Sequence, residues 1–485
     1  MHQHGFEGTK QSVALLTLPD GTGSTIPAGA EIRVRTLNNN ESQQSGEGLA
    51  TGLLQVAFLL AIAFFGFVAG SWAMYAEAPP ARYLADAYRG GQALLAKNTQ
   101  YDSPYPPGFW QKARTERRGV VTYDPARATQ GYTLYTSGEG QRAVLVSMTG
   151  EVLHEWSLPF SAIWDETASV RKPRPDEMIH YNKAYLYPNG DLLAIYEALG
   201  DTPWGYGLAK MDKDSRLIWK YLAHAHHDLD VGPDGNIYLL TQEISHKIVD
   251  RWRHLRPPRI DDFVVVLSPD GQELKKVSML DALVNSPYAR LLNTVAWYSK
   301  DDYTHANAIE LVDEAAAMRL SGQPGRQVLV SMRELGAIGL LDLDREVFTW
   351  AARGPWIGQH DPDLLPNGNM LLFDNVGDFS DRGDSRVIEF NPKTYEIVWS
   401  YAGSTNRPFH SILRSDQERL ANGNTLITES DGGRLLEVTR DGEIVWEYVN
   451  PIRGGEGDEF IPIVAWGQRI DPGRLAPEFL DSPTS

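Results

Sequence analysis

The stretch IHYNKAYLYPNGDLLAIY, residues 179–196, contains the pattern that the rest of the chain repeats. In it the turn Pro188-Asn189-Gly190-Asp191 leads directly into an apolar run. The same kind of turn returns at residues 233–236, 366–369 and 421–424, and each copy is followed by an apolar run (IYLL, MLLF or TLI). Asn-Gly and Asp-Gly suit tight hairpins because both tolerate positive φ. The pattern therefore predicts many short antiparallel strands.

A second turn recurs about halfway between the copies of the first. Its six copies, three clear and three degenerate, are MTGEVLHEW, SPDGQELKKV, TRDGEIVWEY, DKDSRLIWKY, DLDREVFTW and NPKTYEIVWSY. Six copies predict six sheets. The spacing from Gly190 to Gly235 is 45 residues and that from Gly368 to Gly423 is 55, which fits propeller blades of about 40–50 residues.

The expected fold class is therefore all-β, a six-bladed β-propeller over residues 119–470. One blade is expected near residues 304–353, after an inserted segment at 281–303. A pair of β-sandwiches is the alternative, but its strands would not repeat at the spacing of blades.

Residues 49–75 read LATGLLQVAFLLAIAFFGFVAGSWAMY, with no charge and one Gln. This exceeds the roughly 20 apolar residues that a membrane-spanning helix needs. A buried core helix and a cleaved signal peptide are the alternatives. The segment is apolar on every side, and residues 1–48 precede it, which is long for the charged start of a signal peptide. We therefore expect one uncleaved transmembrane helix before the propeller.

The remaining segments are expected to play smaller parts. Residues 1–48 are expected to be a mostly disordered tail. Residues 76–118 are expected to be a connector with a short helix near 80–98, and residues 471–485 a C-terminal tail. Arginines are balanced on the two sides of the span, so charge alone leaves its orientation open.

Composition excludes several classes of function. The chain has 45 basic and 63 acidic residues, a net charge of −18, and no basic stripe, so we expect no nucleic-acid partner. The chain has no cysteine. Disulfides, thiolate zinc sites, iron–sulfur clusters and cysteine nucleophiles are therefore excluded.

Several histidines stand at corresponding places in the repeat. His227 and His360 each lie six residues before the first residue of a hairpin turn, and His305 begins the equivalent strand of the blade between them. His180 lies eight residues before such a turn. In a propeller the residues that lead into the innermost strands crowd the axis at one end. These histidines are therefore expected to converge.

The chemistry of such a cluster follows from imidazole. A neutral His offers a nucleophilic nitrogen, and a charged His donates hydrogen bonds to an oxyanion. Hydrogen bonds between blades and a zinc site of three histidines are the alternatives. Arg333 belongs to the same region, and a cation is unfavourable beside a metal but useful beside an anion. The set therefore favours an anion pocket.

At these residues the sequence resembles the bacterial arylsulfotransferases, which transfer sulfate groups without a nucleotide donor. The resemblance covers roughly residues 131–451. It is carried by HHDLDVGPDGNIYLL, THANAIEL, VSMR, GQHDPDLLPNGNMLLFDN and NGNTLITESDGGRLLEVTRDGEIVWEYVNP. The family fold is a six-bladed propeller, in agreement with the repeat count.

The resemblance implies ping-pong transfer of a sulfuryl group from an aryl sulfate donor to a phenolic acceptor through a sulfated histidine. It implies that His360 is the nucleophile and that His227, His305 and Arg333 complete the catalytic set. Asn307, from the resemblance, and His180, from its nearby register, are the substrate-binding candidates. No metal and no cofactor are expected. Since the family works outside the cytoplasm, the propeller of this single-pass protein is expected on the periplasmic side.

Two other functions remain open from the residues. One is a non-catalytic propeller that acts as a scaffold or sensor in an envelope complex, with membrane-protein partners that the sequence does not identify. The other is a metal-dependent hydrolase of the lactonase type. In every case residues 49–75 are expected to contact the membrane.

Overall fold

The computed structural model describes residues 40–76, 78, 88, 103–296, 299–380 and 384–480. Two compact units divide the chain, residues 1–92 and residues 93–485. The helix expected near residues 80–98 lies outside the described residues apart from Tyr88, as do residues 1–39 of the expected tail.

The first unit contains one long helix, α1 (Asn40–Tyr75). The part from Thr51 to Tyr75 is long and apolar enough to cross a membrane, and none of it is buried within the protein. The helix begins nine residues before the expected start of the span, so residues 40–48 are helical. Apolar side chains on all sides of an unburied helix fit a lipid environment better than water.

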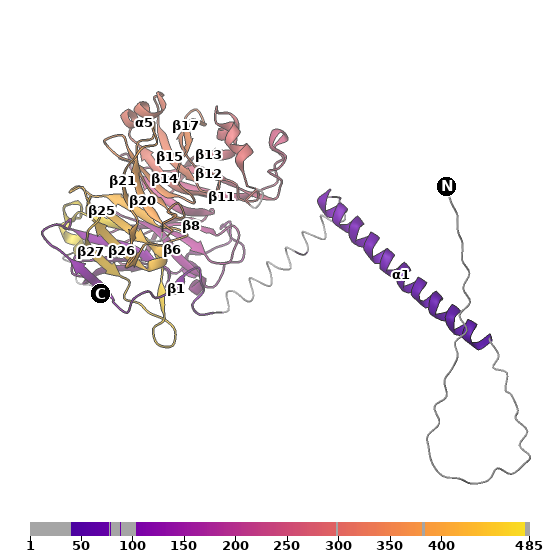
Figure 1. Ribbon diagram of the computed structural model, residues 1–485. Coiled ribbons are helices and arrows are strands. Elements are labelled where there is room, and N and C mark those ends of the chain that lie inside the picture. The colour runs from indigo at the N-terminus through magenta and orange to yellow at the C-terminus, as the bar shows by residue number, and fades with distance from the viewer. Residues whose placement is uncertain are drawn as a thin grey trace, which may run out of the picture. The chain divides into compact units, whose positions relative to one another are not determined.

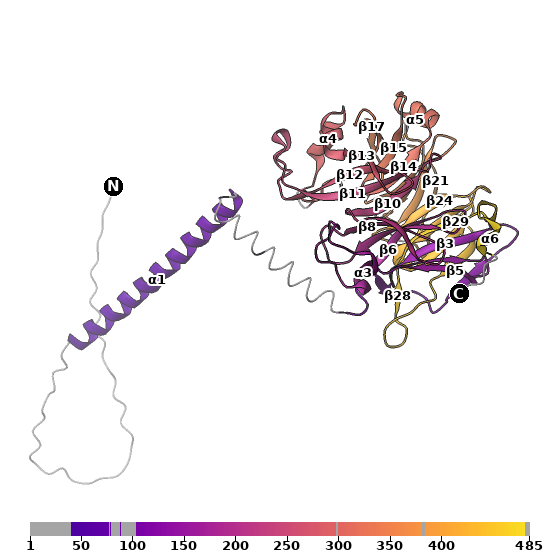
Figure 2. The same ribbon diagram turned by 180° about the vertical axis from the view of Figure 1, so that it is seen from behind.

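The second unit is a six-bladed β-propeller, as the repeats predict (Figures 1 and 2). Each blade is an antiparallel sheet of four or five strands. From the axis outward, blade 1 consists of β29 (Val464–Ile470), β3 (Tyr132–Ser137), β4 (Arg142–Val146) and β5 (Val152–Ser157). Blade 2 consists of β6 (Ile179–Leu186), β7 (Leu192–Ala198), β8 (Gly205–Met211) and β9 (Leu217–Tyr221). Blade 3 consists of β10 (Ala225–Val231), β11 (Ile237–Ser245), β12 (Arg259–Leu267) and β13 (Glu273–Ser278).

Blades 4 to 6 follow the same order. Blade 4 consists of β14 (Ala306–Val312), β15 (Gln327–Met332), β16 (Ala337–Asp342) and β17 (Val347–Arg353). Blade 5 consists of β18 (His360–Leu364), β19 (Met370–Asp374), β20 (Arg386–Phe390) and β21 (Ile397–Tyr401). Blade 6 consists of β24 (Asp416–Arg419), β25 (Thr425–Glu429), β26 (Arg434–Val438), β27 (Ile444–Val449) and β2 (Gly119–Tyr123). The first strands of successive blades contact one another in a closed ring. They therefore surround the axis.

Both ends of the propeller sequence close the ring. Strand β2 adds to the outer edge of blade 6, while β29 forms the inner strand of blade 1 beside β3. Blade 1 and blade 6 are thus each built from distant parts of the chain. This closure leaves no gap between the first and the last blade.

The two recurring turns determine the hairpins. Gly190 has φ of 88° and Gly235 of 80°, the left-handed conformation that the Asn-Gly and Asp-Gly pattern predicts. Apolar side chains from adjoining blades pack between the sheets. Trp156, Tyr181, Tyr196 and Tyr206, for example, are buried in one such cluster between blades 1 and 2.

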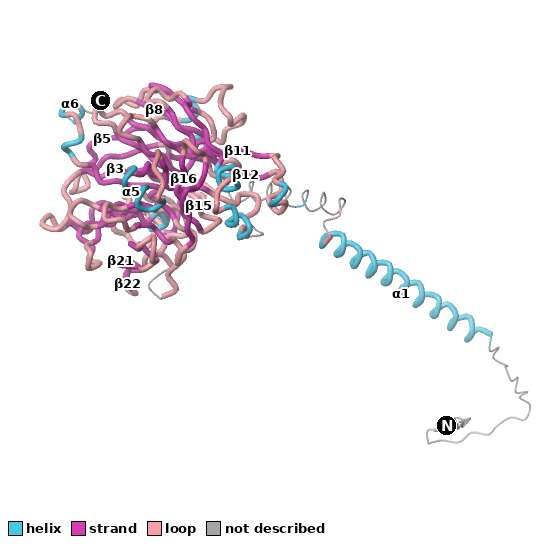
Figure 3. The backbone as a smooth tube through the Cα atoms, turned by 90° about the horizontal axis from the view of Figure 1, so that it is seen from above, coloured by secondary structure: helices cyan, strands magenta, loops and turns pink. Residues whose placement is uncertain are grey.

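Short helices, 3₁₀ turns and two strand pairs lie outside the blade strands, and Figure 3 shows the helices among the loops. They are the helices α3 (Phe160–Ile163), α4 (Met279–Val284), α5 (Glu314–Ser321) and α6 (Pro477–Leu480), the 3₁₀ turns η1 (Asp176–Met178), η2 (Asp250–Trp252), η3 (Ala289–Thr294), η4 (Ser430–Gly432) and η5 (Pro472–Arg474), and the strand pairs β1 (Trp110–Lys112) with β28 (Phe460–Pro462) and β22 (Gly403–Ser404) with β23 (Arg407–Pro408). Much of the expected C-terminal tail is ordered, since Phe479 of α6 is buried against Trp156. Residues 481–485 lie outside the described residues.

Candidate active site at one end of the propeller axis

Five of the six innermost strands have a β-bulge near their first residues. The register shifts between Tyr181 and Ala184 in β6, between His226 and Leu229 in β10, and between His360 and Asp363 in β18. Strands β14 and β29 also carry a bulge. A bulge inserts a residue and redirects side chains. In β6, β10, β14 and β18 the bulge places polar residues at the pocket wall, whereas in β29 it places Ala465 there.

A pocket forms where these bulges meet. Its walls are Asn182, Lys183, His227, Asp228, Asn307, His360, Asp361, Arg414, Ser415, Asp416, Ala465 and Trp466. The residues six places before the hairpin turn of blades 2, 3, 5 and 6 are all among them: Asn182, His227, His360 and Ser415. The repeat register therefore identifies this position on the axis in four blades.

Several of these residues adopt a backbone conformation that is unusual outside glycine. His227, His305, Asp361, Arg414 and Ser415 have φ of 54°, 43°, 48°, 57° and 79°. Each such residue costs on the order of 1–3 kcal/mol and persists where the surrounding structure enforces it. The strain is concentrated at the start of the inner strands, around the pocket.

His360 has a defined tautomer. Its Nδ1 lies 2.8 Å from Asn375 Oδ1 and 3.0 Å from the carbonyl oxygen of Gly358. The Asn375 amide nitrogen donates to the carbonyl oxygens of Ser411 and Arg414, at 2.8 and 2.9 Å, so Oδ1 is the acceptor. The proton of His360 therefore resides on Nδ1, and Nε2 keeps its lone pair for the pocket.

His360 is also held neutral. Burial and the nearby charge of Arg333 lower its pKa to about 3. An imidazole with that pKa is unprotonated across the physiological range. A neutral ring with a free Nε2 lone pair is the form that can attack an electrophile.

His305 has the opposite charge preference. Its Nδ1 donates to Asp302 Oδ2. Burial alone would lower the pKa of His305, but Asp302 outweighs it and the pKa is raised. Trp204 stacks on the ring with centroids 5.0 Å apart. His305 is therefore ready to carry a positive charge beside the pocket.

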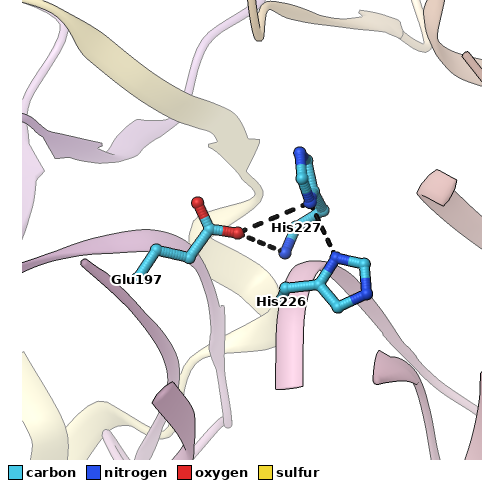
Figure 4. A group of neighbouring side chains, drawn as sticks. All are labelled: Glu197, His226 and His227. Carbon is cyan, nitrogen blue, oxygen red and sulfur yellow. Dashed lines mark hydrogen bonds and ion pairs between the residues drawn. The ribbon is translucent and has the colours of Figure 1, made fainter. Parts of the chain in front are cut away.

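His227 lies between these histidines and a buried carboxylate. Its backbone amide donates to Glu197 Oε1 at 2.6 Å, and its Nδ1 lies 2.8 Å from His226 Nδ1 (Figure 4). Burial and the neighbouring His226, His305, His360 and Arg414 lower its pKa well below the usual value. His227 is therefore a neutral ring whose Nδ1 is engaged, which leaves Nε2 for the pocket.

Glu197, His226 and His227 offer three metal-ligand atoms within 4.8 Å of one another. They form the one such group among the residues that the structure describes. Two imidazole nitrogens on a tetrahedral zinc ion would stand about 3.3 Å apart, given Zn–N bonds of about 2.0–2.1 Å. At 2.8 Å the two Nδ1 atoms share a proton instead. The group thus fits a hydrogen-bonded triad better than a metal site.

Two arginines supply positive charge. Arg333 forms an ion pair with Glu334, but its Nε is buried and has no hydrogen-bond partner among the described residues. Arg414 lines the pocket, and its Nη1 donates to the carbonyl oxygen of Gly108 at 3.1 Å. A buried guanidinium N–H without a partner is costly unless a ligand completes it.

The two remaining predicted residues lie in different surroundings. Asn307 lines the pocket; its Nδ2 donates to the carbonyl oxygen of Gln359 at 2.8 Å, and its buried Oδ1 has no partner among the described residues.

His180 is fully buried against Phe109 and is not part of the pocket wall. Burial and the charge of Arg414 lower the pKa of His180 to about 3. The pocket position of blade 2 belongs instead to Asn182, which donates to the carbonyl oxygen of His227 at 2.8 Å.

Sequence reasoning missed Arg414, Asn182, Trp204 and Lys183. A signal existed for two of them. Asn182 stands six residues before its turn, and Arg414 directly precedes Ser415, which stands at that same position in blade 6. Trp204 and Lys183 carry no repeat signal that distinguishes them from structural residues.

The pocket continues into an acidic channel. Lys183, Asp361 and Trp466 line both the pocket and a second cavity, which is also lined by Asp230, Glu310 and Asp363. Lys183 forms an ion pair with Asp228. Burial raises the pKa of Asp228 to about 6 and that of Glu310 to about 8. The channel thus concentrates carboxyl groups next to a pocket whose walls carry both cations and carboxyl groups.

Fold and site together define a β-propeller with a pocket of histidines, arginines and amides at one end of its axis. The family model described as arylsulfotransferase (ASST) matches residues 183–451. The chain belongs to the arylsulfotransferase family, as the sequence resemblance predicts, and arylsulfotransferase-type activity follows at that general level.

Comparison with solved structures gives distant likenesses. A protein of unknown function from Bacteroides caccae is 14% identical, with a TM-score of 0.43, over 69% of this chain and 99% of that one. A catalytically inactive variant of virginiamycin B lyase from Staphylococcus aureus, solved with quinupristin, is 12% identical, with a TM-score of 0.38, over 72% of this chain and 90% of that one. No curated protein matches this chain significantly.

Proposed function

We propose that this protein transfers a sulfuryl group from an aryl sulfate to a phenolic acceptor through a sulfated His360. The observation that carries the proposal is the state of His360. It is neutral, its proton is held on Nδ1 by Asn375 and Gly358, and its Nε2 is left for the pocket. This arrangement supports nucleophilic attack by Nε2 on sulfur.

The surrounding groups suit the charge that develops in the reaction. Sulfuryl transfer resembles phosphoryl transfer, in which the protein mainly aligns the nucleophile and stabilises charge on the equatorial oxygens. His305 and Arg333 supply positive charge, as does Arg414, and Asn307 supplies a polar side chain. In this proposal His180, which is buried against Phe109 and lies outside the pocket wall, does not contact the substrate.

The reaction has two half-steps. In the first, a bond forms between His360 Nε2 and sulfur while the bond from sulfur to the aryl oxygen breaks, and the aryl group leaves as a phenol. In the second, the oxygen of the acceptor phenol attacks sulfur and His360 regains its lone pair. The proposal places the propeller outside the cytoplasm, as the family resemblance implies.

Replacement of the nucleophile tests the proposal. His360→Ala should abolish transfer from 4-nitrophenyl sulfate to phenol, because no other described pocket residue offers a neutral nitrogen with the same fixed tautomer. Radiolabelled sulfate from the donor should remain on the wild-type protein when acceptor is withheld, and not on the variant. His246→Ala, at an exposed histidine, is the matched control and should keep the wild-type rate and label.

The opposite result has a clear meaning. Full transfer by His360→Ala would exclude the sulfated His360. Loss of the wild-type activity on treatment with a chelator would instead favour the metal-dependent hydrolase, with Glu197, His226 and His227 as its ligands.

A further inference from the structure

The histidine next to His227 has no role in the reaction described so far. His226 is fully buried, and it contacts His227 through Nδ1 and Asp262 through Nε2. The two Nδ1 atoms are 2.8 Å apart, so one carries the proton and the other accepts it. His226 Nε2 lies 3.5 Å from Asp262 Oδ1.

Three neighbours bear on which nitrogen holds the proton: Glu197, Trp204 and Asp262. Glu197 Oε1 lies 3.6 Å from His227 Nδ1 and accepts the hydrogen bond of the His227 amide at 2.6 Å. The indole Nε1 of Trp204, which can only donate, points at His227 Nδ1 from 3.5 Å, so this nitrogen is an acceptor. His226 Nδ1 is then the donor. Asp262 faces the far side of the His226 ring, and a carboxylate there favours a proton on Nε2 as well. A proton on each nitrogen of His226 satisfies both of these contacts, and His227 then carries its own proton on Nε2.

Asp262 is built to remain charged. Its Oδ2 accepts hydrogen bonds from Thr304 Oγ1 at 2.6 Å and from the Ala306 amide at 2.8 Å. Burial would raise the pKa of Asp262, but these hydrogen bonds and the contact with His226 lower it below its usual value. The hydrogen bonds also attach Asp262, on β12, to the start of β14, so its position is fixed from two blades.

We propose that Asp262 and His226 are positioning residues of a proton relay that lets neutral His227 serve as the acid and base of the two half-steps. This inference rests on the function proposed above. In the first half-step the departing aryl oxygen takes the proton of His227 Nε2, and His227 Nδ1 takes the proton of His226 Nδ1. His226 keeps its Nε2 proton toward Asp262. In the second half-step the proton of the acceptor phenol goes to His227 Nε2, and the Nδ1 proton returns to His226.

The relay solves a charge problem of the pocket. His305, His360, Arg414 and His226 all disfavour a positive charge on His227, while Glu197 faces it from β7. A conventional acid would need His227 to be charged before the reaction begins. In the relay the extra proton resides on His226, beside the Asp262 carboxylate, and His227 is neutral before and after each transfer.

The test compares two donors with the full-length enzyme in detergent. Phenyl sulfate has a poor leaving group that needs a proton, whereas 4-nitrophenyl sulfate has a good one that needs it far less. His226→Gln can still donate a hydrogen bond to His227 but cannot transfer a proton. We expect its kcat/KM to fall about 100-fold with phenyl sulfate, a typical loss of acid catalysis, and no more than severalfold with 4-nitrophenyl sulfate.

Two variants complete the design. Asp262→Asn should shift the ratio of the two donors in the same direction, and because both donors meet the same folded enzyme, lost stability does not affect the ratio. His154→Gln alters a histidine whose ring contacts the backbone oxygen of Lys213, and it should leave the ratio unchanged. Equal losses on both donors in His226→Gln, or no loss, would overturn the relay. A wild-type enzyme that transfers from neither donor would instead refute the proposed function.

Discussion

At the scale of single residues, hydrogen bonds to one ring nitrogen assign different roles to three histidines. Asn375 and Gly358 accept from His360, so its other nitrogen keeps a lone pair for the pocket. Asp302 accepts from His305 and favours the charged ring. His226 contacts His227 and shares a proton with it. In the proposed mechanism the same residue type supplies nucleophile, cation and proton carrier, because each ring has a different partner.

The charge of His305 gives a prediction about pH. Its pKa in the folded protein is raised, so the ring is charged below that value and loses its charge as the pH rises through it. The alkaline limb of kcat/KM should therefore lie above pH 6.5. In Asp302→Asn the opposing effects of burial and Arg333 remain, and the limb should move to lower pH.

Rates across a pH series with 4-nitrophenyl sulfate measure this limb. Asp301→Asn, at the exposed neighbouring carboxylate, is the control and should keep the wild-type profile. An alkaline limb that does not move in Asp302→Asn would mean that the charge of His305 does not contribute to the rate.

At the scale of elements, the bulged inner strands and helix α1 have separate tasks. A regular strand would alternate its side chains between the two faces of a blade. The bulges in β6, β10 and β18 interrupt this alternation at the pocket. Helix α1 carries no charged residue over Thr51–Tyr75, and this part of it is not buried. Its composition suits a membrane anchor.

The anchor yields a prediction about topology. The natural chain lacks cysteine, so a single introduced cysteine reports its own side of the membrane. Lys172→Cys, at an exposed position of the propeller, should react with a membrane-impermeant maleimide in intact spheroplasts. Ser12→Cys, before the helix, should react only after detergent is added. The reverse labelling would place the propeller in the cytoplasm, and labelling of both without detergent would exclude a span.

At the scale of the whole molecule, the propeller axis concentrates ionisable groups. The pocket walls carry Lys183 and Arg414 together with Asp228, Asp361 and Asp416, and further carboxyl groups line the adjoining channel. Glu310 lies in this channel, and its Oε2 accepts from the amide of Leu364 at 3.0 Å. Burial first, and then the charges of Asp230, Asp361 and Asp228, raise its pKa to about 8.

This shift predicts how stability depends on pH. Folded Glu310 keeps its proton up to about pH 8, while the unfolded chain releases it near 4.5. Between these values the folded state binds more protons, so the free energy of unfolding falls as the pH rises. Glu310→Gln mimics the protonated form. It should raise Tm at pH 8 by at least about 2 °C and leave Tm at pH 4.5 nearly unchanged.

Calorimetry of the full-length protein at the two pH values provides the measurement. Glu314→Gln, at an exposed position of α5, should change Tm at neither pH. A lower Tm of Glu310→Gln at pH 8 would show that the ionised carboxylate stabilises the channel, which is the opposite of the expected sign.

The sequence by itself determined the propeller, the apolar helix and the family. These features depend on local order: Asn-Gly turns permit positive φ, short apolar runs form strands, and an uncharged stretch of 27 residues is long enough for a bilayer. The register of the repeat also predicted that His227 and His360 lie at the axis. The same register, applied to blade 2, indicates Asn182 rather than His180.

Only the tertiary structure decided which nitrogen of each histidine faces the pocket. His360 depends on Asn375, and Asn375 is oriented by the loop that holds Arg414. His226 on β10 meets Asp262 on β12, two strands away in the same blade. Hydrogen bonds of this kind join residues that are distant along the chain, and they require a fixed geometry of a few ångströms. Local sequence patterns do not specify that geometry, because it forms only when the blades close around their axis.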